Sequence, residues 1–160
     1  MSATGADSVL LRNVVERVVT GRGGNADDVV RACAASQCLS ADMAHGTHPN
    51  YPERHEPNHW ITLGGGPVIK TNINQRYATD GETGARFRLA CDRVGVPVQE
   101  YAHRSDLACG STIGPITAAR LGISTFDVGM PSLSMHSIRE LMASSDVSLM
   151  CTAFAAWLTA

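Results

Sequence analysis

The sequence predicts an α/β fold in which helices pack on a largely parallel central sheet. Short apolar runs bounded by glycine or proline alternate along the chain with segments in which apolar residues recur at helical spacing. Strands that alternate with helices are typical of one layered sheet covered by helices. With 160 residues and no internal repeat, the chain corresponds to a single compact domain.

The composition excludes several classes of protein. Hydrophobic residues make up 44% of the sequence and charged residues 18%, as in ordinary globular proteins rather than disordered ones. The net charge of −2 and the lack of a lysine or arginine cluster argue against nucleic-acid binding. No apolar run reaches the roughly 18 residues that span a bilayer, and the first residues lack signal-peptide features. We therefore expect a cytoplasmic protein without membrane partners.

The five cysteines are an odd number and form no C-x-x-C pair, which argues against a disulfide framework and against a thiolate zinc site. Cys91 and Cys151 fall on apolar helical faces. We expect both to be buried free thiols.

Two helices are predicted at the start of the chain. The first covers about residues 7–19 and ends at the glycine-rich segment 21–24. The second covers residues 26–35 and begins after Asn25, a residue type that caps helix N-termini well. Their inward-facing side chains are predicted to be Leu11, Val14, Val15 and Val18 in the first helix, and Val29, Val30 and Cys33 in the second.

A short strand over residues 37–41 is predicted to lead into Asp42, and residues 46–66 form a long polar loop. Loops longer than about 15 residues in a compact domain are usually functional. A buried strand follows at residues 67–70 and carries Lys70 at its end.

The next helix is predicted from the capping-box spacing of Thr79 and Glu82, and it stops at Gly95. Residues 96–101 read as a strand. The inward face of the helix is predicted to be Phe87, Ala90, Cys91 and Val94.

The last third of the chain predicts a helix over residues 115–121, with Pro115 in its first turn and Gly122 after its end. A strand over 123–128 and a loop over 129–131 follow. The final helix covers residues 146–158. Its buried side chains are predicted to be Met150, Phe154 and Trp157. Sites in such folds lie at the carboxyl ends of strands, where we expect Asp42, Lys70 and the loop after Val128 to fall.

Asp42 and His45 place a carboxylate and an imidazole three residues apart, at the predicted end of a strand. Oxygen and nitrogen donors on a rigid backbone suit a zinc-like cation. By itself the pair equally fits an aspartate that caps a turn and a histidine on the surface.

Two other motifs do not predict function. His55-Glu56-Pro57-Asn58-His59 matches the H-E-x-x-H zinc motif, but that motif requires a helix, and Pro57 stands in the middle of it. The segment is therefore predicted to be a loop. Gly64-Gly65-Gly66 precedes a strand and opens no helix, so we expect a flexible lead into that strand rather than a phosphate-binding loop.

Six segments follow one another in a specific order, and the resemblance that they carry extends over nearly the whole chain. They are Ser40–His45, His55-Glu56-x-Asn58-His59, Gly66–Lys70, Asn74–Thr79, Cys109–Pro115 and Leu133–Glu140. This order resembles the C-terminal half of the aspartyl aminopeptidase family, cytosolic metallopeptidases with two zinc ions. The resemblance implies that residues 1–160 are the C-terminal portion of a zinc-aminopeptidase catalytic domain, which is incomplete in this chain.

The resemblance also implies roles for individual residues. Asp42 matches the terminal carboxylate ligand of one zinc, and His136 matches the terminal imidazole ligand of the other. His45, Lys70 and Tyr77 match positions that contact the substrate, a peptide with an acidic N-terminal residue. The residue types agree with this, because a lysine pairs with an acidic side chain and an imidazole or phenol binds a carbonyl oxygen that gains charge.

The family's other metal ligands and its general-base glutamate lie N-terminal to the part that this chain resembles, and its tetramer-forming insert is missing. No catalytic base is therefore expected among these residues. We expect the chain alone to bind zinc weakly, to hydrolyse peptides negligibly, and to aggregate or to require its missing half. Two readings remain open: an aminopeptidase chain present only in part, or a non-catalytic fragment that acts as a binding or assembly module.

Overall fold

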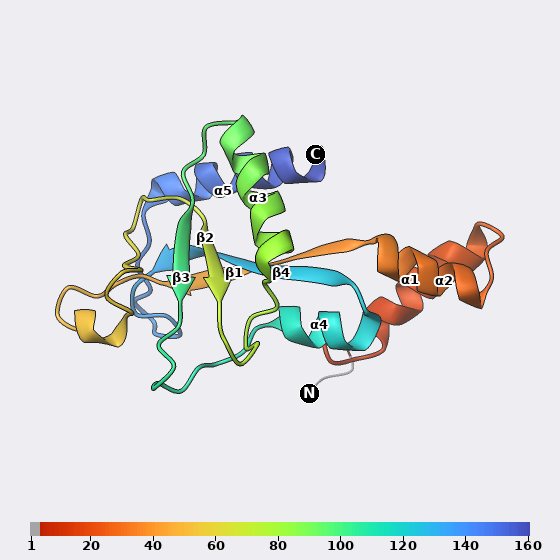
Figure 1. The fold of residues 1–160 in the computed structure, drawn as a ribbon, viewed down its shortest axis with the longest axis horizontal. Coiled ribbons are helices and arrows are strands. Elements are labelled where there is room, and N and C mark those ends of the chain that lie inside the picture. Colours follow the sequence, from red (N-terminus) through yellow and green to blue (C-terminus); the bar gives the residue numbers. More distant parts are fainter. Residues whose placement is uncertain (1–3) are drawn as a thin grey trace.

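The computed structural model describes residues 4–160 and confirms the α/β class (Figure 1). Helices α3 and α5 lie on one side of a four-stranded sheet, and α4 lies on the other. The pair α1–α2 projects from one end of the molecule. In chain order the elements are α1 (Leu10–Gly21), α2 (Ala26–Ala35), β1 (Gln37–His45), the 3-10 turn η1 (Pro52–Arg54), β2 (Val68–Thr71), α3 (Gly81–Arg93), β3 (Gln99–Ala102), α4 (Ile113–Leu121), β4 (Ser124–Ser132) and α5 (Ser144–Leu158).

The strand order is β1-β4-β2-β3. Strands β1 and β4 pair in parallel, as do β2 and β3, whereas β2 and β4 are antiparallel. The sheet is therefore largely parallel, as predicted, with one antiparallel pairing at its centre. Because β2 runs against β1 and β4, the expectation that Asp42 and Lys70 lie at the same edge of the sheet is wrong.

Strands β1 and β4 are longer than predicted. Asp42 lies within β1 rather than after it, and residues 129–131 belong to β4 rather than to a loop. The parallel ladder continues through Asp42↔Gly129 to His45↔Ser132, and its backbone hydrogen bonds outweigh the weak strand preference of a Gly-Met-Pro segment. A Cβ atom at Gly129 would lie 2.5 Å from the carbonyl carbon of Met43. Glycine therefore permits the close approach of the two strands.

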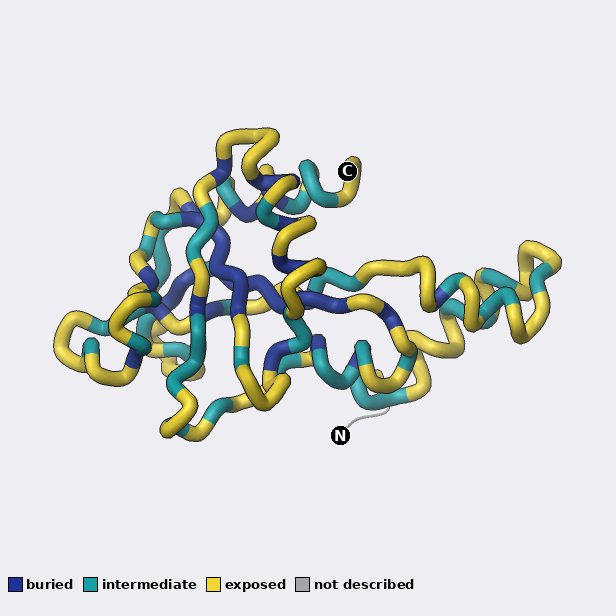
Figure 2. Tube along the Cα trace, viewed as in Figure 1, coloured by how far each residue is buried: buried dark blue, intermediate teal, exposed yellow. Residues whose placement is uncertain are grey.

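The main core lies between the sheet and helices α3 and α5, where the tube in Figure 2 is darkest. The ring of Phe126 on β4 packs 5.2 Å from Phe87 and 5.5 Å from Trp157, measured between ring centroids. Met150 is buried, and Phe154 packs against the same cluster, as predicted for the last helix. A second buried cluster comprises Ala44, Ile61, Val68, Tyr77 and Tyr101.

Several predicted inward positions are exposed. No residue of α1 is buried, so the predicted face of Leu11, Val14 and Val18 has no cover among residues 4–160 (Figure 2). In α2 only Cys33 is buried, and Val30 is exposed. A burial pattern needs a packing partner, and the contact of α1 with α2 leaves Leu11, Val14 and Val18 exposed.

Two further inward positions are wrong. Val94 is exposed because α3 ends there. Cys151 is exposed because it points away from the side on which Met150 is buried, whereas Cys91 is buried as predicted. All five cysteines are free.

The helix ends follow the sequence closely. Helix α3 is capped by Asp80 and Thr83, and not by the predicted Thr79 and Glu82. The side chain of each accepts a hydrogen bond from the backbone N–H of the other. Gly95 and Gly122 adopt φ values of +67°, which suits glycine after a helix. Helix α4 begins two residues before Pro115, and β3 begins at Gln99 rather than at residue 96.

The glycine segment 64–66 is held in place rather than flexible. The carboxylate of Asp146, which is buried in the first turn of α5, accepts the backbone N–H of Gly64 at 2.8 Å and that of Gly66 at 3.0 Å. A Cβ atom at Gly66 would lie 2.3 Å from the carbonyl oxygen of Pro97. The segment therefore binds an anion, but the anion is a side chain of the same protein.

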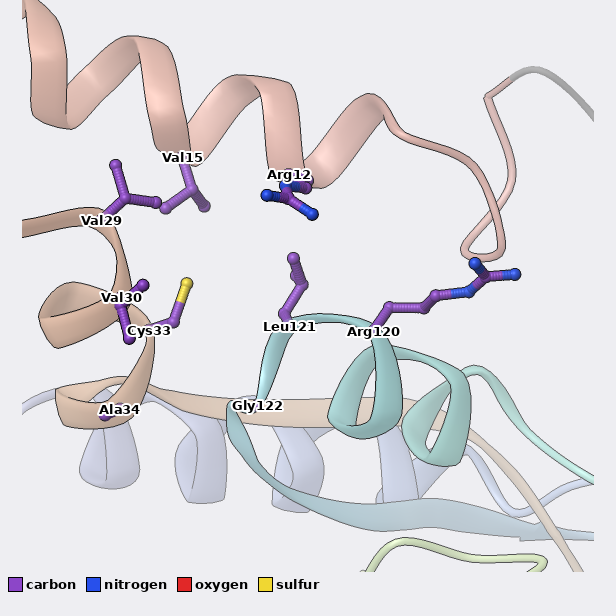
Figure 3. A pocket seen from close by; sticks show the side chains of 9 residues that line it. All are labelled: Arg12, Val15, Val29, Val30, Cys33, Ala34, Arg120, Leu121 and Gly122. Atoms are coloured by element: carbon purple, nitrogen blue, oxygen red, sulfur yellow. The ribbon is translucent and has the colours of Figure 1, made fainter. Parts of the chain in front are cut away.

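A cavity of about 240 Å³ lies between α1, α2 and α4 (Figure 3). Apolar side chains such as Val15, Val29 and Leu121 surround it, with Cys33 beside them. Two arginines, Arg12 and Arg120, also line it. Within residues 4–160, no helix combines the length and apolar character required to cross a membrane.

Candidate active site

The structure brings together three of the five predicted site residues, Asp42, Lys70 and Tyr77. The ammonium group of Lys70 donates to the carboxylate of Asp42, and also to the carbonyl oxygen of Met43 at 3.1 Å. It lies 5.1 Å from the centroid of the Tyr77 ring, within cation–π distance. The Lys70 side chain is 3% exposed, and that of Asp42 is 44% exposed. A buried cation thus meets a carboxylate that is partly open to solvent.

The strand register explains how residues from β1 and β2 meet across β4. Asp42 and Val68 both pair with Gly129 of the intervening strand. Lys70 follows Val68 by two residues and therefore points to the same face of the sheet. Its four-carbon side chain spans the remaining distance to Asp42.

Burial and charge set the protonation states at this point. Burial raises the pKa of the Asp42 carboxyl, although the hydrogen bond from Lys70 acts in the opposite direction. Burial lowers the pKa of the His45 imidazole, and positive charge on His55 and Lys70 lowers this pKa further. Burial, together with a hydrogen bond with Cys109, raises the pKa of the Tyr77 phenol well above its ordinary value. At neutral pH the site therefore presents a neutral imidazole and a neutral phenol.

Asp127 holds the segment that follows Tyr77. Its carboxylate accepts the backbone N–H of Ala78 at 2.6 Å, and its own N–H donates to the hydroxyl of Thr79 at 2.9 Å. Asp127 is fully buried, and a Cβ atom at Gly114 would lie 2.3 Å from its carboxylate. Asp127 is not among the predicted site residues, although a carboxylate inside the apolar run 126–128 is the kind of signal that identifies such a residue.

His136 lies in the loop that follows β4 and is exposed. Its φ is +67° and that of Ser134 is +57°, and its backbone N–H donates to the carboxylate of Glu140. Non-glycine residues with positive φ are uncommon and often lie at functional sites. His136 is also near enough for its positive charge to lower the pKa of His45.

The residues present do not form a complete zinc site. Asp42 and His136 supply an oxygen and a nitrogen donor of the types that zinc prefers. Among residues 4–160, however, no group of three or more histidine, cysteine, aspartate or glutamate side chains could hold a metal ion. A catalytic zinc normally has about three protein ligands. Two terminal donors can therefore contribute to a metal centre only together with other residues.

A cavity of about 690 Å³ adjoins His45. It is lined by four histidines, Arg54, two tyrosines and small or apolar residues, and no carboxylate side chain lines it. The hydroxyl of Tyr101 and Nδ1 of His103 are 2.7 Å apart, and Nε2 of His55 lies 3.1 Å from the carbonyl oxygen of His45. Asp42, Lys70 and Tyr77 are not among the lining residues.

Three residues of this cavity are not among the predicted site residues: Tyr101, His103 and Arg54. They lie on β3, after β3 and in η1, and only the folded chain brings these elements together. His55 belongs to the H-E-x-x-H segment, which forms no helix, as predicted.

The comparisons with known proteins agree with the geometry. Residues 1–158 match the family described as aminopeptidase I zinc metalloprotease (M18). The chain is 57% identical over 159 residues to a Mycobacterium tuberculosis protein named "Probable M18 family aminopeptidase 2" and covers 99% of itself and 37% of that protein. A Streptomyces coelicolor protein of the same name is 51% identical over 157 residues, with coverage of 98% and 36%.

Solved structures show the same fold. The S. cerevisiae mApe1 dodecamer matches with a TM-score of 0.85 and 33% identity over 99% of this chain and 35% of that chain. The crystal structure of prApe1 matches with a TM-score of 0.93 and 34% identity over 99% of this chain and 33% of that chain. The chain therefore spans about a third of the length of the relatives that it matches. It belongs to the M18 family of aminopeptidase I zinc metalloproteases.

Proposed function

We propose that this chain is part of a zinc aminopeptidase that removes N-terminal Asp or Glu residues from peptides. Membership of the M18 family supports the reaction class. The buried ammonium group of Lys70 supports the preference for an acidic residue, because a substrate carboxylate would pair with this cation once Asp42, its partner here, held zinc. This ammonium group is the observation that carries the proposal.

The residues present would have separate roles. Asp42 and His136 would each hold one of two zinc ions, which when bound would activate a water molecule and polarise the scissile carbonyl. Lys70 would bind the acidic side chain of the first residue. His45 and Tyr77, neutral at pH 7, would hydrogen-bond to the peptide near the scissile bond. The general base and the other metal ligands would come from residues outside this chain.

Lysine-specific NMR tests directly whether the ammonium group of Lys70 binds an acidic first residue. Lys70 is the only lysine in the sequence, so ¹³C-lysine labelling gives one set of side-chain signals. We expect peptides that begin with Asp or Glu to shift the Cε signal of Lys70, and peptides that begin with Asn or Gln to leave it unchanged. Equal shifts with both sets of peptides would contradict the proposed preference.

Zinc titration tests the expectation that this chain supplies only some of the ligands of the metal site. Because each zinc would find only one donor here, isothermal titration of the chain with zinc should show weak binding. The chain alone should not hydrolyse acidic peptides in an activity assay. Submicromolar affinity with a stoichiometry near two would overturn the proposal that other residues complete the site.

A second candidate function is a non-catalytic binding or assembly module, and uncovered apolar surface favours it. Strand β1 is at the end of the sheet, and its outer side has no strand partner among residues 4–160. An apolar cavity of about 520 Å³ adjoins this strand and is lined by Leu39, Phe154 and Trp157 among others. Such surface normally packs against another part of a protein.

Mixing the chain with the separately expressed remainder of the Mycobacterium tuberculosis relative distinguishes the two functions. Aminopeptidase activity that neither piece shows alone supports the catalytic proposal. A stable complex without activity supports the assembly module.

A further inference from the structure

The cavity beside His45 is lined by basic side chains and by no acidic ones. His45, His48, His55, His103 and Arg54 line it, and no aspartate or glutamate does. Six arginines form ion pairs within the described residues 4–160, and Arg54 is one of the six that do not. A guanidinium without a partner, in a cavity free of carboxylates, favours an anionic ligand.

The hydrogen bonds of His48 leave one donor for that ligand. Its Nδ1 accepts the backbone N–H of Asn50 at 3.1 Å, so the ring proton of the neutral imidazole lies on Nε2. The ring also lies against Tyr51, at a centroid distance of 5.2 Å. His48 thus offers a positioned N–H beside the charge of Arg54.

Two buried polar atoms in the cavity wall have no hydrogen-bond partner among residues 4–160. They are Nδ1 of His55, a residue 7% exposed, and the hydroxyl of Ser132, a residue 2% exposed. Nε2 of His55 is occupied by the carbonyl oxygen of His45, which leaves Nδ1 as an acceptor. Unsatisfied buried polar groups are rare and costly, so the pair indicates that this wall of the cavity acquires a further polar partner.

The size and place of the cavity identify that ligand as a peptide segment. Its volume of about 690 Å³ lies within the range of about 300–1,000 Å³ typical of ligand sites. It begins at His45 and does not include Lys70 or Tyr77. If the first residue of a peptide binds at Lys70 and its scissile carbonyl lies near His45, the residues that follow would enter this cavity.

We propose that the cavity binds the peptide segment downstream of the N-terminal residue and selects a second carboxylate there, with Arg54 and His48 as the recognising residues. This inference rests on the proposed function, because the direction of the peptide follows from binding of the first residue at Lys70. The carboxylate comes from an acidic side chain at the third position or from the free C-terminus of a short peptide.

Peptide titrations of the 160-residue chain followed by NMR test this inference. We expect Asp-Ala-Glu-Ala-amide to bind about threefold to fivefold more tightly than Asp-Ala-Gln-Ala-amide, the range for one partly exposed charge pair. Free Asp-Ala-Ala compared with its amide measures the C-terminal source separately. Arg54→Gln should remove the preference, Arg54→Lys should retain most of it, and Arg17→Gln, at an exposed site on α1, should leave it unchanged.

Each outcome has a distinct meaning. Equal affinity for the Glu and Gln peptides, or a preference that survives Arg54→Gln, overturns the inference. Ala-Ala-Glu-Ala-amide tests the first position separately. If replacing the first Asp has no effect while the preference at the third position persists, the proposed function fails and the anion site stands. If no peptide binds at millimolar concentration, the inference fails.

Discussion

The buried ammonium group of Lys70 on β2 donates to the carboxylate of Asp42 on β1, although β4 lies between their strands. The contact joins a proposed substrate-binding residue to a proposed metal ligand in one ion pair. Neither position predicts the other from the sequence, because they are 28 residues apart and their strands run in opposite directions.

Replacing Lys70 should affect both stability and Asp42. In Lys70→Met, Asp42 loses its cation, and we expect its pKa to rise further because the burial that already raises it is no longer opposed. The loss of a hydrogen bond to a charged group should lower the free energy of unfolding by about 1–3 kcal/mol. Urea unfolding and a ¹³C pH titration of the aspartate carboxyls measure these effects. An unchanged Asp42 pKa would show that the pair is not formed in solution.

Replacing Asp146 should release the glycine segment 64–66. Asp146→Ala removes the acceptor for two backbone N–H groups, and charged acceptors of this kind stabilise a fold by about 1.5–3 kcal/mol each. We expect the free energy of unfolding to fall by about 2–4 kcal/mol, and the amides of Gly64 and Gly66 to exchange faster with solvent. Ser145→Ala, at the exposed neighbouring position, is the matched control and should change neither measurement.

Adding a methyl group at Gly114 should disturb Asp127. The new Cβ atom in Gly114→Ala would lie 2.3 Å from the Asp127 carboxylate, so that side chain must move away from Ala78. We expect a loss of about 1–3 kcal/mol, as for other overpacked sites, and a shift in the ring signals of Tyr77. In Gly81→Ala the new methyl group meets no atom within 4 Å, so this variant should keep wild-type stability or exceed it. Equal stability of the two variants would contradict the contact.

The cap of α3 should depend on pH. Hydrogen bonds from the backbone of Thr83 lower the pKa of Asp80 below its ordinary value, so the folded state binds this proton less readily than the unfolded state. The stabilisation by the cap is therefore present above the unfolded pKa of about 3.9 and is lost as the pH falls through the lower folded pKa. Asp80→Asn keeps the cap without a titrating group. The stability difference between wild type and Asp80→Asn should therefore shrink below pH 4, and a constant difference would be inconsistent with a lowered pKa.

Local signals in the sequence were sufficient for much of the fold. Asn25 caps α2 and Gly122 follows α4, because caps and stops depend on a few neighbouring residues. Pro57 prevents a helix in the H-E-x-x-H segment for the same local reason.

What the sequence could not provide depends on long-range pairing. The length of β1 follows from its ladder with β4, more than 80 residues away, and not from its own residues. The cavity combines Arg54, Tyr101 and His103, which no spacing rule connects. The exposed face of α1 failed as a prediction because an apolar stripe shows that a helix packs, but not whether its partner lies in the same chain.

The predicted site residues had mixed outcomes. The meeting of Lys70 and Tyr77 with Asp42 agrees with the resemblance on which they were chosen. The roles of Asp42 and His136 as zinc ligands, and of His45, Lys70 and Tyr77 as substrate contacts, stay predictions.

Gly129 gives the arrangement a consequence for evolution. It is the shared partner of Asp42 on one side and Val68 on the other, and the close approach of Met43 leaves no room for any larger residue. A mutation there would change the spacing between the strand that carries Asp42, the proposed metal ligand, and the strand that carries Lys70, the proposed specificity residue. Side chains around Lys70 can therefore change without altering this spacing, whereas the distance between the proposed metal ligand and the proposed recognition residue depends on Gly129.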